Sequence, residues 1–261
     1  MNRKSLQDRA KIIQLLCEGN SMRGTSRIMD CSINTVTKLL EETGARCLEI
    51  QDRLLVDLPC KRIQVDEMWS FCYAKKQNLP DGKDGGDLWT FTAICPDTKI
   101  IPCFRVGPRE AEVAVDFLQE VADRVEGKFQ LSTDGWSAYR NAVDGLDVDF
   151  GRIVKQYAKP MGKRFGGYNG QVKEAFSGDP DPAHIQTVHV ERANLTMRMS
   201  VRRLARKTNA HSKKEENHKL ALAMFFAFYN FCRIHKTLRV TPAMAAGVTD
   251  KVWGIEDLIS V

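Results

Sequence analysis

The sequence lacks the cysteine patterns that define two common classes of protein. Its eight cysteines are dispersed, and no two of them form a C-x-x-C pair, so we do not expect a zinc site built on paired cysteines. A chain of 261 residues, 43% of them apolar, can stabilise itself by burial, which argues against a disulfide scaffold. Dispersed thiols instead fit a reducing compartment.

Long apolar runs are also missing. No stretch of about 18 apolar residues could span a bilayer, and no apolar run that could serve as a signal peptide follows the basic N-terminus. We therefore expect a soluble cytoplasmic protein with no membrane partner. The net charge of +6 suggests a polyanionic partner, although many basic proteins bind no nucleic acid.

Residues 1–50 contain helical patterns only. A first helix stops at Gly19, a short second helix covers Met22–Met29, and Ser32 is a good N-cap for a third helix over about 33–42. This order predicts a helix-turn-helix DNA-binding module; the alternative is a small helical cap without DNA contact. Three side chains of the third helix could reach base edges or phosphates: Asn34, Thr35 and Lys38.

After a linker at 51–60, the pattern changes to strands and helices over 61–247. Apolar and β-branched runs predict strands, and longer periodic runs predict helices. The strands are expected at 62–73, 87–95, 99–106, 128–133 and near 152–157, and the helices at 109–125, 136–142, 190–207 and 213–232. This is the order of a ribonuclease-H-like α/β domain with a mixed five-stranded sheet. Glycines and prolines mark an insertion at about 159–182, and 248–261 is expected to form a C-terminal helix.

Three acidic residues stand at positions suited to metal-dependent phosphoryl transfer. Asp66 lies inside an apolar strand, where burying a carboxylate is costly unless it is paired, and Glu67 is an immediate competitor facing the opposite side. Asp134 directly follows a strand, at the kind of edge where ligands bind, although an Asp there is often only an N-cap. Glu191 opens a long helix, where it could merely complement the helix dipole.

The sequence around these acids resembles a known family. The segments Val65–Trp69, Ser132–Tyr139 and Val190–Asn194 are similar to the three acidic blocks of bacterial insertion-sequence transposases of the DDE class, which share a fold with retroviral integrases. Tyr229–His235, followed by Leu238 and Pro242, is similar to their C-terminal signature, except that Ile234 replaces a proline.

The resemblance implies a complete functional hypothesis. It selects Asp66 over Glu67 and makes Asp66, Asp134 and Glu191 the ligands of two Mg²⁺ ions, which Mn²⁺ can replace. It implies cleavage at transposon ends followed by strand transfer. The expected partner is double-stranded DNA, both the terminal inverted repeats and the target DNA, and no small-molecule substrate is expected. The resemblance also implies that the protein acts as a homo-multimer on the DNA. Possible auxiliary residues are Glu67, Asn194, Arg233 and His235.

Basic residues dominate the segment that begins at Glu191. Between Glu191 and Lys214 there are eight Lys or Arg and one acid, which favours a path for a DNA backbone over a solvated helix face. The expected DNA contacts here are Arg198, Arg202, Arg203, Arg206 and Lys207. Two other functions remain: a helix-turn-helix regulator with an inactive core, and a nuclease of the same fold that cuts without joining.

Overall fold

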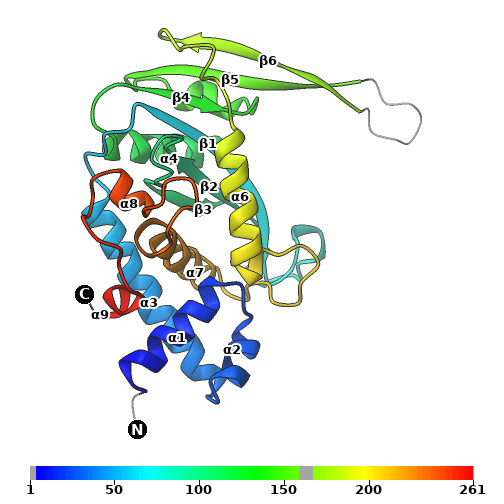
Figure 1. The fold of residues 1–261 in the computed structure, drawn as a ribbon. Coiled ribbons are helices and arrows are strands. Elements are labelled where there is room, and N and C mark those ends of the chain that lie inside the picture. Colours follow the sequence, from blue (N-terminus) through cyan, green and yellow to red (C-terminus); the bar gives the residue numbers. More distant parts are fainter. Residues whose placement is uncertain (1–3, 159–166, 261) are drawn as a thin grey trace.

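A mixed six-stranded sheet forms the centre of the computed structural model, which describes residues 4–158 and 167–260 (Figure 1). The strands are β1 (Arg62–Cys72), β2 (Gly86–Ile94), β3 (Phe104–Gly107), β4 (Phe129–Thr133), β5 (Val148–Tyr157) and β6 (Tyr168–Ser177). They lie in the order β3-β2-β1-β4-β5-β6. β1, β2 and β3 pair antiparallel, whereas β4 pairs parallel with both β1 and β5. The expected ribonuclease-H-like α/β fold is thereby confirmed.

The sixth strand differs from the expected five-stranded sheet. β6 pairs antiparallel with β5 inside the segment that the sequence indicated as an insertion, and residues 159–166 of that insertion lie outside the described residues. β6 is exposed on both faces for most of its length, so it carries no alternation of apolar and polar residues from which a strand could be recognised.

The helices pack around this sheet and below it. They are α1 (Leu6–Cys17), α2 (Met22–Ile28), α3 (Ile33–Leu54), α4 (Ala111–Arg124), α5 (Ala138–Ala142), α6 (Val188–Ser200), α7 (Glu215–Ala227), α8 (Pro242–Ala245) and α9 (Ile255–Ser260). Short 3₁₀ turns cover Lys76–Asn78 and Arg202–Leu204, and a π-helical turn at Phe228–Cys232 extends α7. No helix in residues 4–158 and 167–260 is long and apolar enough to cross a membrane. All eight cysteines are free thiols.

Two helix boundaries correct the expectations from sequence. α3 continues past residue 42 to Leu54, because Cys47 and Ile50 extend its buried face, and it thus occupies the start of the expected linker. α6 ends at Ser200, well before Lys207, because Val201 adopts an extended conformation. Val201 and Leu204 nevertheless remain buried in the core together with Val190, Ala193 and Met197 of α6.

Close packing between α3 and α7 fastens the N-terminal helices to the rest of the protein. At Gly44 of α3, an added Cβ would lie 2.6 Å from both the Cβ and the carbonyl oxygen of Leu220 on α7. The amide of Gln51, also on α3, donates a hydrogen bond of 3.1 Å to the carbonyl of Ala223. The two helices approach this closely because Gly44 has no side chain.

Gly44→Ala therefore tests this contact. Alanine normally stabilises a helix interior relative to glycine by up to about 1 kcal/mol. Here we expect the opposite sign, a loss of about 1–3 kcal/mol in the free energy of unfolding, because the new methyl group would overpack the interface. Urea denaturation measures this change. Gly167→Ala, where an added Cβ meets nothing within 4 Å, is the control; a Gly44→Ala protein as stable as the parent would contradict the close packing.

Candidate active site

Three carboxylates meet where β1 and β4 separate. β1 pairs with β4 only through Arg62–Gln64, so both Asp66 and Glu67 lie just beyond the last paired residue. Asp134 directly follows the last residue of β4. One carboxylate oxygen from each of these three residues lies within 4.8 Å of the others. The structure thus brings together two of the three predicted metal ligands, Asp66 and Asp134, and adds Glu67.

Glu67 is already neutralised by its neighbours. Its carboxylate accepts hydrogen bonds from Nε of Arg109 at 2.7 Å and from the hydroxyl of Tyr139 at 2.8 Å, and its side chain is only 2% exposed. Asp66 points to the other face of the sheet, where Nδ2 of Asn194 on α6 donates to it at 2.8 Å. The alternation of a β-strand explains the opposite directions of these two neighbours.

Asp134 does not cap a helix in the way that the simpler interpretation of its position suggested. α5 begins at Ala138 with Ser137 at its N-cap position, and Oδ1 of Asp134 instead accepts the backbone N–H of Trp136 at 2.9 Å. This local turn holds the carboxylate towards Asp66 and Glu67. Asp134 is partly exposed, so it can be reached from solvent.

The cluster carries more negative charge than its surroundings compensate. Burial, followed by repulsion from Glu67 and Asp134, raises the pKa of Asp66 from 3.8 to about 7. Burial and repulsion from Asp134 also raise the pKa of Glu67, against the lowering effect of Tyr139 and Arg109. A divalent cation would relieve this repulsion, because it favours the ionised form of every nearby carboxylate.

Two buried oxygens beside Asp66 fit the same ion. Oδ1 of Asn194 and Oγ1 of Thr92 are both buried without a hydrogen-bond partner in the described residues. Thr92 lies directly opposite Asp66 in the β1–β2 pair, so the two side chains share a face of the sheet. Since Mg²⁺ is bound almost entirely by oxygen, the donor set of Asp66, Asp134 and these unsatisfied oxygens suits it.

Contacts with β1 fix the position of α6. Oε1 of Gln64 accepts the backbone N–H groups of His189 and Val190 at 2.9 and 3.2 Å, which caps the start of the helix. At the other end, Arg198 donates to the carbonyl of Trp69 at 3.2 Å. α6 therefore lies along β1, with Asn194 opposite Asp66 (Figure 1). Nothing in the sequence around Gln64 indicates that its side chain caps the start of α6.

Glu191 lies beside the cluster and outside the group of three. Its exposed carboxylate accepts hydrogen bonds from Nζ of Lys155 on β5 at 2.8 Å and from the hydroxyl of Thr187 at 3.2 Å. The bond to Glu191 raises the pKa of Lys155, and Asp66 adds a smaller effect of the same sign. Glu191 and Asn194 are three residues apart on α6 and thus neighbours on one side of the helix. Lys155 could not be recognised from the sequence as the partner of Glu191, because lysines near the ends of strands are common.

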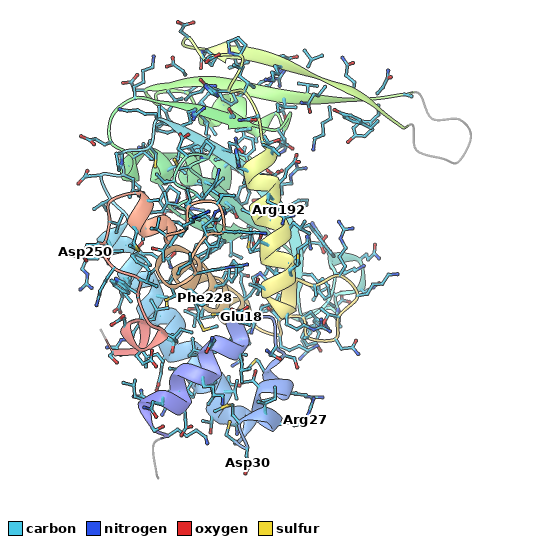
Figure 2. All side chains as sticks on the ribbon, in the orientation of Figure 1. Glu18, Arg27, Asp30, Arg192, Phe228 and Asp250 are labelled. Carbon is cyan, nitrogen blue, oxygen red and sulfur yellow. The ribbon has the colours of Figure 1, made fainter. Side chains whose placement is uncertain are left out.

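The predicted DNA contacts divide into exposed and anchored side chains. Asn34 and Lys38 on α3 are exposed and Thr35 is partly exposed, at the end of the molecule where Figure 2 shows Arg27 and Asp30.

In the basic segment that follows Glu191, two arginines are held by other parts of the protein. The guanidinium of Arg198 donates to the carbonyls of Trp69 and Leu204, and that of Arg203 donates to Ser212 and to the carbonyl of Asn217. The exposed members of the basic set are Arg202, Arg206, Lys207 and the auxiliary Arg233. The second auxiliary residue, His235, is partly exposed, and its ring contacts Thr237.

Comparison with known proteins supports the resemblance seen in the sequence. No protein-family profile matches the chain. The insertion element iso-IS1n protein InsB of Shigella dysenteriae is 26% identical over 168 residues, which cover 64% of this chain and 95% of that protein. The resemblance to insertion-sequence proteins is thereby confirmed.

The similar solved structures are more distant. A piggyBac transposase synaptic complex with hairpin DNA has 10% identity and a TM-score of 0.44, over 98% of this chain and 70% of that chain. The Mos1 mariner paired-end complex with Mn has 10% identity and a TM-score of 0.24, over 57% of this chain and 60% of that chain. The fold assignment therefore rests on the strand order and directions described above.

The raised pKa of Asp66 predicts a stability change in the metal-free protein. Because its pKa is about 7 when folded and 3.8 ordinarily, the ionised carboxylate destabilises the folded state increasingly as pH rises from about 4 to 7. We expect Asp66→Asn to be more stable than the parent at pH 8, on the order of a few kcal/mol since one pKa unit corresponds to about 1.4 kcal/mol. The difference should disappear below about pH 4. Urea denaturation in EDTA at both pH values measures it.

Glu191→Gln is the matched control for that measurement, because Glu191 is exposed and paired with Lys155. We expect it to show no gain in stability at pH 8. Equal stability of the Asp66→Asn protein and the parent at pH 8 would show that the carboxylates do not repel one another as described.

Proposed function

We propose that this protein is a DDE-type transposase that cuts and joins DNA strands with divalent metal ions, Mg²⁺ by preference, held by Asp66, Asp134 and Glu191. The observation that carries the proposal is the meeting of Asp66 and Asp134 at the separation of β1 and β4, with uncompensated negative charge and unsatisfied oxygens beside them. The similarity to InsB, a protein of an insertion element, supports DNA ends as the substrate.

Glu191 completes the ligand set from α6. Its helix is fixed by Gln64 and Arg198, and it stands one turn before Asn194, which touches Asp66. The ammonium of Lys155 now bonds to Glu191 and lies close enough to Asp66 to interact with it, so its single positive charge offsets only part of the charge of these two acids. In this proposal, Lys155 releases Glu191 when a metal ion binds, and its ammonium becomes available to a phosphate oxygen.

The remaining residues of the site orient these ligands. Asn194 holds one oxygen of Asp66, and the N–H of Trp136 holds one oxygen of Asp134. Arg109 and Tyr139 keep Glu67 turned to the other face, which gives it a structural role. When bound, paired metal ions supply activation of the attacking oxygen and stabilisation of the leaving oxygen.

DNA is the proposed partner, bound as inverted repeats and as target by a multimer of this chain. A groove of about 930 Å³ lies between the N-terminal helices and the segment after α6. Six basic residues line it: Arg23, Arg202, Arg203, Lys207, Lys213 and Lys214. A phosphate backbone fits a groove of this charge, and we propose that it connects the exposed face of α3 with the rest of the basic surface.

Removal of each proposed ligand tests the function. Asp66→Asn, Asp134→Asn and Glu191→Gln should each lower Mg²⁺-dependent nicking and joining of labelled duplexes ending in the inverted repeats by at least about 100-fold, because each removes a charge that binds metal. Gel electrophoresis of the labelled strands measures both products. Glu67→Gln should lose less than about 10-fold, since the amide oxygen can still accept from Arg109 and the amide NH2 can donate to the hydroxyl oxygen of Tyr139.

Glu112→Gln serves as the matched control, because Glu112 is an exposed acid of α4 with no part in the site. Full activity of any one of the three ligand variants would remove that residue from the metal site. Sequence-specific binding of end DNA without nicking or joining by the parent protein would favour the inactive regulator, and nicking without joined product would favour a nuclease.

A further inference from the structure

A group of aromatic rings lies on the face of the sheet that α6 does not cover. Trp69 and Phe71 follow Glu67 at alternate positions of β1, so their side chains share its face. Trp89 of β2 is the direct cross-strand partner of Trp69, and Trp136 follows Asp134. We call these four residues, Trp69, Phe71, Trp89 and Trp136, the aromatic strip.

Core packing does not account for Trp69 and Phe71. Both are partly exposed, and neither belongs to the two buried hydrophobic clusters or to the apolar residues packed against them. Their rings instead contact each other, with centroids 5.7 Å apart, and the ring of His211 lies 4.8 Å from that of Phe71. Two large aromatic side chains that stay partly exposed on a strand face, outside the core, mark a candidate binding surface.

Cations are interleaved with these rings. The guanidinium of Arg109 lies 4.9 Å from the ring of Trp89 and 4.6 Å from that of Trp136, and its side chain is 35% exposed. The ammonium of Lys75 lies 5.6 Å from the ring of Trp69. Arg109 also bonds to Glu67, so the strip begins beside the carboxylate cluster and leads away from it along β1.

This combination favours unpaired nucleotides over other occupants. Bases that are free of a duplex stack on aromatic faces, while cations between the rings pair with the phosphates that link them. Same-face residues on a strand are about 6.6–6.8 Å apart, a spacing that lets successive bases of an extended strand each meet a ring. A duplex hides its base faces, and an apolar protein partner would not require the ammonium of Lys75 beside Trp69.

We propose that the aromatic strip binds unpaired DNA bases next to the strand that is cut. The placement rests on the proposed function, because it identifies the carboxylate cluster as the position of the reacting phosphate. Binding there would hold the ends of a duplex open beside the part of β1 that no longer pairs with β4, where Asp66 and Asp134 meet.

A binding experiment without metal tests the strip separately from catalysis. Fluorescence anisotropy in EDTA measures the affinity of a labelled 12-nucleotide thymidine strand and of a labelled 12-base-pair duplex. We expect Trp69→Ala combined with Phe71→Ala to weaken single-strand binding by at least about 10-fold, because each stacked base contributes about 5-fold or more in affinity and two rings are removed. Duplex affinity should change less than about 2-fold. Trp69→Phe should retain most of the single-strand affinity, since a ring remains.

Phe176→Ala is the control, because Phe176 on β6 is an exposed aromatic residue with arginines beside its ring, at the far edge of the sheet. We expect it to leave single-strand affinity unchanged. Circular dichroism and thermal melting of every variant verify that it is folded.

Three outcomes overturn the proposal: unchanged single-strand affinity in the double variant, equal loss for single strand and duplex, or an equal loss in Phe176→Ala. A change from dimer to monomer in sedimentation, with single-strand affinity intact, would assign the strip to a contact between copies of the chain. Failure of the ligand variants to alter nicking would refute the proposed function while leaving the single-strand result standing, so the two failures are distinguishable.

Discussion

Mutual repulsion of Asp66, Glu67 and Asp134 is the constraint on which the rest of the site depends. Three carboxylates with oxygens within 4.8 Å cannot all ionise without compensation. The fold itself compensates the charge of Glu67, because Arg109 forms an ion pair with this carboxylate and the hydroxyl of Tyr139 donates a hydrogen bond to it. Asp66 and Asp134 accept neutral donors, the amide of Asn194 and the backbone N–H of Trp136, and two nearby oxygens have no partner among the described residues. The compensation is therefore divided into a fixed part for Glu67 and a part that the proposed metal ions would supply to Asp66 and Asp134.

The alternation of β1 distributes these tasks between the two faces of the sheet. Gln64 and Asp66 face α6, where one caps the helix and the other contacts Asn194. Glu67 and Trp69 face the opposite side, where the fixed ion pair and the aromatic rings lie. A shift of one residue in the register of β1 would exchange the two sets, so the pairing of β1 with β2 and β4 determines which acid faces α6 and the proposed metal site.

The sequence predicted those features that depend on local pattern. The order of strands and helices follows from periodicity, and Asp134 could be placed because a strand end precedes it. Features that depend on contacts distant in sequence could not be predicted. The partner of Glu191 is Lys155, 36 positions earlier on β5, and the end of α6 depends on how Val201 and Leu204 reach the core. β6 could not be predicted from the sequence, because an edge strand that is exposed on both faces does not require alternating apolar and polar residues.

The ion pair between Lys155 and Glu191 shows why the metal-free arrangement is compatible with a ligand role for Glu191. Both side chains are well exposed, 41% for Lys155 and 44% for Glu191. Exposed pairs contribute only about 0–1 kcal/mol, so breaking this one costs little compared with the attraction between a divalent cation and an additional carboxylate. Glu67, by contrast, is buried in its ion pair, and separating a buried pair is costly. Exposure thus favours Glu191 over Glu67 as the proposed third ligand, although Glu67 lies nearer to the other two acids.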